Sequence, residues 1–168
     1  MRLFLGSFAQ IPRYDEIRDS FKNRMDANWV APRNLHLTWY FLGKHPSPAP
    51  FIEKLRGLAM IPRLPMGLHD IGYFNPNDPR ILYLAPSPTV PKILHEKIAE
   101  MLGMDPHPNF RPHVTLARIH KILDPAWQEA LPTWQNGEFG RIDPTIYLIE
   151  SRLTPHGPIY LPIEEFAC

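Results

Sequence analysis

The sequence predicts an α+β protein, because short strand-like and helix-like segments alternate along the chain and one arrangement of them occurs twice. In each copy, a strand, a helix and a loop lead into a second strand that opens with a histidine. Proline accounts for 21 of the 168 residues, and the prolines lie mostly between the periodic segments, as punctuation between many short elements. With 44% hydrophobic residues, the chain can bury a core and fits one globular domain.

The first copy begins with a strand over residues 2–9. A helix is expected after Pro12, because apolar residues recur there at helical spacing. These apolar residues are Tyr14, Ile17, Phe21 and Met25. A loop through Pro32 follows, and residues 35–42, rich in aromatic side chains, predict a strand that Gly43 closes.

The second copy repeats this order. Residues 81–85 predict a strand, and Pro91 marks the start of a helix. A proline-rich loop over residues 106–112 then leads into a strand at residues 113–119. The apolar stripe expected along the helix consists of Val90, Leu94, Ile98 and Met101. The remaining segments are helices at residues 52–58 and 125–134 and strands at residues 66–73, 142–153 and 159–166.

Charge and cysteine content exclude several classes of protein. The 18 basic and 17 acidic residues give a formal net charge of +1, which argues against a general DNA-coating role. The single cysteine, Cys168, allows neither an intrachain disulfide nor a closed thiolate metal site, and no reactive role is expected for it. No apolar run approaches the roughly 18 residues of a membrane span, and the apolar stretch at the start is too short for a signal peptide. We therefore expect a soluble cytoplasmic protein.

Two short motifs carry the chemistry of the sequence. The triplets at residues 36–38 (His-Leu-Thr) and 113–115 (His-Val-Thr) each open the second strand of a copy, 77 positions apart. With eight histidines and six threonines in the chain, only about 0.3 such triplets are expected by chance. Side chains two residues apart on a strand project from the same face about 6–7 Å apart. Each triplet therefore presents an imidazole beside a hydroxyl.

Two such pairs facing each other across a cleft suit a phosphodiester substrate. One group must deprotonate the attacking water, another must protonate the leaving oxygen, and neutral donors must stabilise the nonbridging oxygens. Histidine titrates closest to neutral pH, so one imidazole can be neutral while the other is charged. Catalysis of this kind needs no metal.

The residues around both triplets resemble a known family. Residues 34–43 read Asn-Leu-His-Leu-Thr and, after two further positions, Phe-Leu-Gly, whereas residues 110–118 read Phe-Arg-Pro-His-Val-Thr-Leu-Ala-Arg. These stretches are similar to the paired signatures of bacterial and archaeal RNA 2′,3′-cyclic phosphodiesterases. That 2′,5′ RNA ligase-like family belongs to the two-histidine (2H) phosphoesterase superfamily. Weaker agreement with the opening strand and with residues 151–160 extends the resemblance over essentially the whole chain.

The resemblance implies a bilobal, pseudo-duplicated α+β fold, in which two antiparallel sheets flank a central cleft and helices lie on the outer faces. Residues 1–168 would then form a single phosphoesterase domain of two intertwined lobes, with one triplet in each. The implied reaction is hydrolysis of a terminal 2′,3′-cyclic phosphate of RNA to a 2′-phosphomonoester. Relatives also join RNA ends reversibly through 2′,5′ linkages, and we take hydrolysis as the main reaction.

Catalytic roles follow from the resemblance. His36 would be the proton donor to the departing 3′-oxygen and His113 the proton acceptor for water, and the two roles could be exchanged. Thr38, Thr115 and Arg118 would bind the phosphate. Arg118 lies five positions after His113, so strict strand alternation sends its side chain to the opposite face. Contact with the phosphate therefore requires a twist, a bulge or a strand end at the cleft.

Three further residues are candidates for lining the pocket: Tyr40, Phe41 and Ser151. By alternation, Tyr40 shares the face of His36 and Thr38, so it either stacks on a base or simply lines the cleft. Three cations could form a basic rim for an RNA backbone, or equally could be scattered surface charge. They are Arg33, Lys44 and Arg111.

The other six histidines have no repeated partner in the sequence, so we expect them on the surface or in loops. They are His45, His69, His95, His107, His120 and His156. The expected partner is RNA with a 2′,3′-cyclic phosphate end, tRNA fragments among such RNAs, bound by a monomer without metal, cofactor or membrane contact.

Three alternatives stay open. The first is an enzyme for another phosphodiester, such as a 2′,5′-linked oligonucleotide or a cyclic nucleotide derivative. The second is an RNA-end binding module without catalytic activity. The third is a metallohydrolase with the two histidines as ligands, which a chelator would inactivate.

Overall fold

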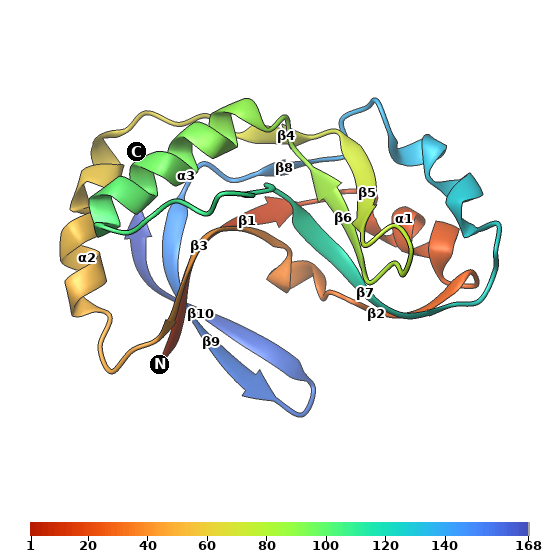
Figure 1. The fold of residues 1–168 in the computed structure, drawn as a ribbon, viewed down its shortest axis with the longest axis horizontal. Helices are drawn as coiled ribbons and strands as arrows, with labels where there is room; N and C mark the ends of the chain where they lie inside the picture. Colours follow the sequence, from red (N-terminus) through yellow and green to blue (C-terminus); the bar gives the residue numbers. More distant parts are fainter. Residues whose placement is uncertain (168) are drawn as a thin grey trace.

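An antiparallel sheet of ten strands is the main element of the computed structural model, which describes residues 1–167 and leaves Cys168 outside the description (Figure 1). The strands are β1 (Arg2–Gln10), β2 (Met25–Trp29), β3 (His36–Lys44), β4 (Met66–Leu68), β5 (Asp70–Phe74), β6 (Ile81–Ala85), β7 (Val114–Ile122), β8 (Gly140–Ile142), β9 (Ile146–Thr154) and β10 (Gly157–Phe166). The α-helices are α1 (Tyr14–Phe21), α2 (Ala49–Leu55) and α3 (Thr89–Leu102). Short 3₁₀ turns are η1 (Pro32–Asn34), η2 (Arg56–Met60), η3 (Trp127–Ala130) and η4 (Pro132–Trp134). This inventory confirms the predicted α+β class. Across the described chain, no helix is both long enough and apolar enough to cross a membrane.

The strand order brings the two motif strands together. The main path runs β10-β9-β1-β3-β7-β6-β5, with every pair antiparallel. Off this path, β2 pairs with β7, and β8 pairs with β1 and β4. The two expected sheets are joined where Leu37 of β3 pairs with Val114 of β7. Because these are the residues directly after each motif histidine, the two triplets meet at the middle of one continuous sheet.

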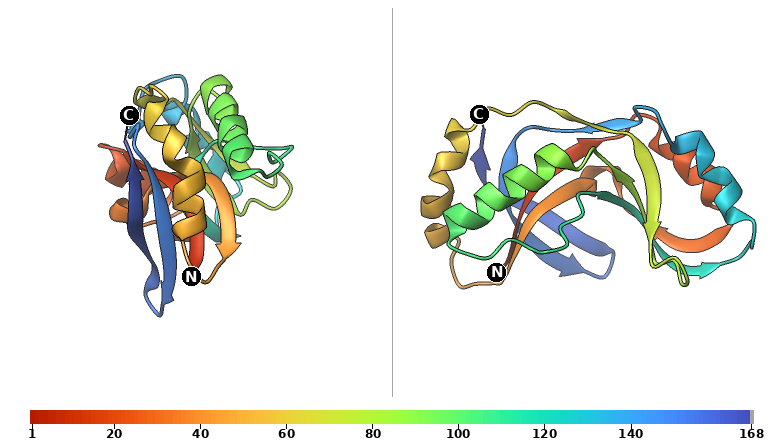
Figure 2. Two further views of the ribbon diagram at one scale, coloured as in Figure 1. Left: turned by 90° about the vertical axis from the view of Figure 1, so that its left-hand side faces the viewer. Right: turned by 45° about the horizontal axis from the view of Figure 1, so that its top comes forward.

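The helices lie at opposite ends of the molecule. Figure 2 shows α2 and α3 at one end and α1 with the turns η3 and η4 at the other. Tyr14 of α1 donates a hydrogen bond to the carbonyl of Leu116 in β7, whereas His95 of α3 contacts the carbonyl of Trp39 in β3. The helix of each copy therefore packs against the motif strand of the other copy. The division into two intertwined lobes stays a prediction, which this exchange supports.

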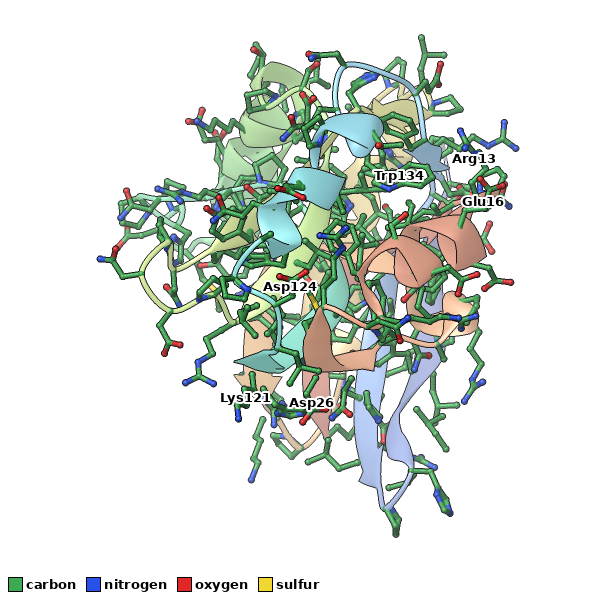
Figure 3. All side chains as sticks on the ribbon, turned by 90° about the vertical axis from the view of Figure 1, so that its right-hand side faces the viewer. Arg13, Glu16, Asp26, Lys121, Asp124 and Trp134 are labelled. Atoms are coloured by element: carbon green, nitrogen blue, oxygen red, sulfur yellow. The ribbon has the colours of Figure 1, made fainter. Side chains whose placement is uncertain are left out.

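At the end of the molecule that contains α1, Arg13 contacts both a neighbouring acid and the buried Trp134 (Figure 3). Arg13 forms an ion pair with Glu16 at 2.7 Å, and its guanidinium lies 4.8 Å from the centre of the Trp134 ring. Asp26 and Lys121 occupy paired positions on β2 and β7. The contact of Arg13 with Trp134 connects the start of α1 to the turn η4.

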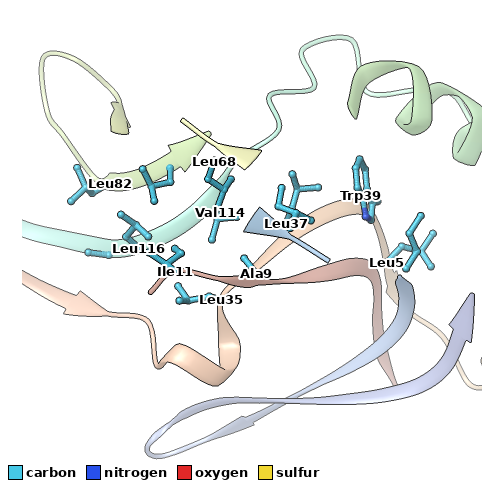
Figure 4. Close-up of a cluster of buried hydrophobic side chains, with 14 of the residues drawn as sticks. Leu5, Ala9, Ile11, Leu35, Leu37, Trp39, Leu68, Leu82, Val114 and Leu116 are labelled. Atoms are coloured by element: carbon cyan, nitrogen blue, oxygen red, sulfur yellow. The ribbon is translucent and has the colours of Figure 1, made fainter. Parts of the chain in front are cut away.

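The core forms on the face of the sheet opposite the motif side chains (Figure 4). Leu37 and Val114 are fully buried there, at 0% exposure. Trp39, 1% exposed, donates its indole N–H to the Ser7 hydroxyl at 2.8 Å, and that hydroxyl donates to the Thr145 carbonyl at 2.7 Å. The indole N–H of Trp39 and the hydroxyl of Ser7 thus both have hydrogen-bond partners, as buried polar groups require.

Three element predictions were wrong. Met25 does not extend α1: the loop predicted there contains β2, in which Met25 is buried and pairs with β7. Residues 125–134 form two 3₁₀ turns in place of a helix, because Pro132 has no N–H for a continuing helix. Val90 is 61% exposed and does not belong to the buried face of α3. That face consists of Pro91, Leu94, His95, Ile98, Ala99 and Leu102.

Candidate active site

The two triplets share one face of the sheet. His36 and Thr38 lie at the start of β3, whereas His113 directly precedes β7 and Thr115 is its second residue. The residue between each pair points into the core, so the imidazoles and hydroxyls project from the other face. All four side chains line a single cleft of about 1160 Å³. The sequence-predicted catalytic residues are therefore brought together.

Each imidazole is fixed by the same backbone contact. His36 Nδ1 lies 2.7 Å from the carbonyl oxygen of Asn34, and His113 Nδ1 lies 2.7 Å from that of Arg111. A carbonyl oxygen only accepts, so each Nδ1 carries the hydrogen and donates it. In the neutral ring, Nε2 is then free to take a proton, and in the charged ring it is the nitrogen that can give one. Both histidines are thus prepared for acid and base chemistry at the same ring position.

Aromatic side chains flank both imidazoles. The ring centroids of Phe4 and Tyr160 lie 5.1 Å and 4.8 Å from that of His36. The centroids of Phe74 and Tyr83 lie 4.9 Å and 5.6 Å from that of His113. These four residues restrict ring rotation and remove water from the histidines. No functional role was predicted for them, because the contacts depend on which strands pair.

Burial lowers the pKa of both histidines, because an apolar surrounding disfavours the charged ring. The bond to the Asn34 carbonyl opposes this effect at His36 and raises its pKa, and the Arg111 carbonyl does the same at His113. Positive charge on His113 and Arg118 lowers the pKa of His36 further, and Arg118 also lowers the pKa of His113. The two imidazoles and Arg118 therefore interact electrostatically within one cleft.

Both motif strands bulge at the residue after the threonine. In β3, Thr38 is opposite Gly6 and Tyr40 is opposite Leu5, so Trp39 is the extra residue. The pairing of β6 with β7 shows the same shift, because Thr115 and Ala117 face consecutive residues of β6. The extra residue in β7 is Leu116. A bulge interrupts alternation and turns the following side chains to the other face.

The bulge in β7 provides the geometry that Arg118 requires. Past the extra residue, Arg118 returns to the face of His113 and Thr115, and its side chain lines the cleft.

Of the three possible rim cations, Arg33 lines the same cleft, whereas Lys44 and Arg111 do not. The Arg111 guanidinium lies instead 5.9 Å from the centre of the Phe74 ring.

The bulge in β3 makes the prediction for Tyr40 wrong. Tyr40 is turned away from the cleft, where its hydroxyl donates to the Asp105 carbonyl at 2.8 Å and its ring stacks on His95. Phe41 takes the place on the cleft face that strict alternation gave to Tyr40, and it is 72% exposed. Ser151 of β9 also lines the cleft. His95 was expected on the surface or in a loop, and this prediction was also wrong, because His95 lies in α3 and is only 4% exposed.

The hairpin of β9 and β10 forms one wall of the cleft, and Figure 1 shows it projecting from the rest of the sheet. Leu153, Pro158 and Tyr160 of this hairpin line the cleft together with residues 27–31.

Within residues 1–167, no group of three or more histidine, cysteine, aspartate or glutamate side chains is placed to hold a metal ion. The absence of a metal from the mechanism stays a prediction.

Comparison with known proteins identifies the family. The sequence model of the 2′-5′ RNA ligase superfamily matches residues 8–142, a region that contains both triplets. The chain belongs to the 2′-5′ RNA ligase superfamily. Among curated superfamily relatives, the RNA 2′,3′-cyclic phosphodiesterase of Aquifex aeolicus is 32% identical, with 99% of this chain and 96% of the relative covered. The protein of the same name from Archaeoglobus fulgidus is 28% identical, with 99% of each chain covered.

Solved structures share the superfamily fold. A structure from Thermus thermophilus has a TM-score of 0.73 and 26% identity, and covers 99% of this chain and 97% of its own. E. coli LigT complexed with phosphate has a TM-score of 0.64 and 21% identity, and covers 98% of this chain and 95% of its own. At 21% identity, the similarity to LigT shows only that the two chains share a fold.

Proposed function

We propose that this member of the 2′-5′ RNA ligase superfamily hydrolyses the 2′,3′-cyclic phosphate at RNA ends to a 2′-phosphomonoester. The observation that carries the proposal is the pair of imidazoles, each with Nδ1 bound to a carbonyl and Nε2 left for proton transfer, beside two threonines on one cleft. Full-length relatives named RNA 2′,3′-cyclic phosphodiesterase, at 28–32% identity, support the same substrate.

In the proposed reaction, His113 Nε2 removes a proton from water and the water oxygen attacks phosphorus. The bond from phosphorus to the 3′-oxygen breaks, and the leaving oxygen takes a proton from Nε2 of His36. Thr38 and Thr115 donate hydrogen bonds to the nonbridging oxygens, and Arg118 balances their charge. Proton exchange with solvent then restores both histidines.

The protonation states needed at the start follow from the charge of the substrate. Buried imidazoles with lowered pKa values are mainly neutral near pH 7 in the free protein. An anionic phosphate in the cleft favours the protonated form of a neighbouring imidazole and offsets the positive charge of Arg118. Substrate binding therefore supplies the charged histidine that acts as the acid. Because both rings donate Nδ1–H to a backbone carbonyl and leave Nε2 for proton transfer, an exchange of their roles leaves the reaction unchanged.

The same site supports reversible 2′,5′ ligation as a secondary activity. If the 5′-hydroxyl of a second RNA replaces water, its oxygen forms the new bond to phosphorus and the 3′-oxygen leaves as before. The proton from the 5′-hydroxyl passes to the base, and the acid protonates the 3′-oxygen. The family description, 2′-5′ RNA ligase superfamily, is the support for this activity.

The cleft surface fits an RNA end. Arginines at positions 2, 33 and 118 line it, and cations of this kind bind phosphate oxygens along a nucleic acid backbone. Phe41, at 72% exposure, offers an aromatic surface on which a base can stack. We include tRNA fragments with cyclic phosphate ends among the proposed substrates.

The test is to incubate the purified protein, in the presence of a chelator, with a short RNA that ends in a 2′,3′-cyclic phosphate. Formation of a 2′-phosphate is the expected result. A 3′-phosphate would overturn the assignment of the leaving oxygen, and binding without any product would indicate an RNA-end binding module. Loss of activity only when the chelator is present would point to a metallohydrolase.

A further inference from the structure

His95 is a buried titratable residue that the proposed mechanism does not use. Its ring on α3 lies between those of Phe110 and Tyr40, with centroid distances of 4.0 Å and 5.6 Å and interplanar angles of 5° and 21°. His95 Nδ1 is 2.7 Å from the carbonyl oxygen of Trp39, and Nε2 accepts a hydrogen bond from the backbone N–H of His107 at 2.9 Å. Because Trp39 offers an acceptor and His107 a donor, both bonds require the neutral ring with its hydrogen on Nδ1.

The partners of His95 belong to the two segments that carry the motif histidines. Trp39 is the bulge residue directly after Thr38 on β3. His107 and Phe110 lie in the segment between α3 and β7, shortly before His113. One imidazole therefore connects the strand of the first triplet to the segment that leads into the second.

This connection continues to the ring of His113. The same segment contains Arg111, whose carbonyl accepts the hydrogen bond of His113 Nδ1. Between α3 and β7 the segment has no strand or helix of its own, so its position depends on side-chain contacts. The contacts that reach it from β3 and α3 include the stack on His95, the bond that the His107 N–H donates to Nε2, the bond from the Tyr40 hydroxyl to the Asp105 carbonyl and, at the start of the segment, the bond from the Met104 N–H to the Ala99 carbonyl.

We propose that His95 is a positioning residue, which holds the segment before His113 against the bulge of β3 and so sets the placement of His113 relative to His36. The proposal rests on the proposed function, since it concerns the acid and base of that reaction. A shift of about 1 Å in a reacting group can lower a rate by about 100-fold. His95 acts through His113 and does not contact the substrate itself.

The first test is the variant His95→Phe, which keeps an aromatic ring between Tyr40 and Phe110 but removes both hydrogen bonds. We expect kcat to fall by about 10- to 100-fold with KM within about threefold, because the threonines that bind phosphate stay on their strands. The matched control is Phe21→Leu, a core substitution in α1 away from the cleft. At an equal decrease in Tm, the control should keep the wild-type kcat, and an equal loss of kcat in both variants would overturn the proposal.

A double-mutant cycle separates positioning from a general structural role. If His95 acts through His113, then His95→Phe should not lower the residual rate of His113→Ala any further. A loss by the same factor in both backgrounds would show that His95 acts independently of His113. Should His95→Phe fail to fold, His95→Gln replaces it, because an amide oxygen can still accept from the His107 N–H. His95→Gln should retain more of kcat than His95→Ala.

A measurement without substrate distinguishes this proposal from the proposed function. Burial lowers the pKa of His113 and the bond to the Arg111 carbonyl raises it, so loosening of the segment before it should change this pKa. Titration of the imidazole signals by NMR should show that shift at His113 in His95→Phe. An unchanged pKa of His113 would overturn the positioning role. If the wild-type protein has no activity toward the cyclic phosphate, the proposed function fails, and the NMR result still decides the role of His95.

Discussion

Replacement of Arg118 by methionine tests the cleft geometry and the electrostatics together. The bulge at Leu116 turns Arg118 to the face of His113 and Thr115, where the guanidinium can donate to a nonbridging phosphate oxygen. Hydrogen bonds to charged groups contribute about 1.5–3 kcal/mol, and Arg118 is exposed, so we take about 1.5–2 kcal/mol. Arg118→Met should therefore lower kcat/KM for an RNA 2′,3′-cyclic phosphate by about 10- to 30-fold.

The same substitution should move the pH dependence in a defined direction. The charge of Arg118 lowers the pKa of both His36 and His113, so its removal should raise both pKa values. In a bell-shaped profile of kcat/KM, both limbs should then shift to higher pH. The profile reports apparent pKa values of the coupled pair and does not assign them to one ring.

Two further variants make this test specific. Arg118→Lys keeps the positive charge, so it should leave both limbs in place and recover part of the rate. Arg141→Met removes an arginine of β8 that does not line the cleft and contacts Gln10, so it should change neither quantity. Wild-type kcat/KM in Arg118→Met, or limbs that move to lower pH, would refute the reasoning.

Four other substitutions give direct expectations. His36→Ala and His113→Ala should each lower kcat by at least about 100-fold with folding retained, measured by product formation and circular dichroism, and substantial turnover in either would refute the two-histidine mechanism. Ser7→Ala should lower the free energy of unfolding by about 1–3 kcal/mol in urea titrations, because it leaves the buried indole N–H of Trp39 and the Thr145 carbonyl without their partner. Gly103→Ala should lower it by about 1–2 kcal/mol, because residue 103 ends α3 with φ of 67° and a side chain is strained there even in open space. Stability equal to wild type would contradict either expectation.

Much of the fold could be predicted from local patterns. The strands that carry the triplets and the first strand of each copy were predicted correctly; burial alternates throughout β6 and up to the bulges of β3 and β7, whereas β1 is buried continuously from Leu3 to Ser7. Met25 was placed in the wrong element because a single buried residue fits both the end of a helix and the start of a strand. The pairing of β2 with β7 decides between these possibilities, and pairing is a property of distant segments.

In the site as well, residues identified by local sequence patterns were predicted correctly, whereas features that depend on contacts between distant segments were not. The repeated triplet was sufficient to find His36 and His113, and the spacing of Arg118 showed that a bulge or twist was needed. No comparable sign existed for Tyr40, which alternation placed on the wrong face. The aromatic neighbours of the histidines and the burial of His95 depend on contacts between β1, β5, β10, α3 and the segment before β7. Only the folded chain brings these contacts together.

The bulges at matching positions of β3 and β7 explain how a repeated arrangement of strands provides two different binding surfaces. Each bulge directs the fifth residue after the histidine into the cleft, and these residues are Phe41 in one copy and Arg118 in the other. The cation lies on the strand of His113, and its charge lowers the pKa of both imidazoles. The aromatic ring lies on the strand of His36, where it can contact a base and adds no charge. Two imidazoles with the same kind of backbone contact therefore have different surroundings, a cation on the strand of His113 and an aromatic ring on that of His36, and the assignment of His36 as the acid and His113 as the base stays a prediction.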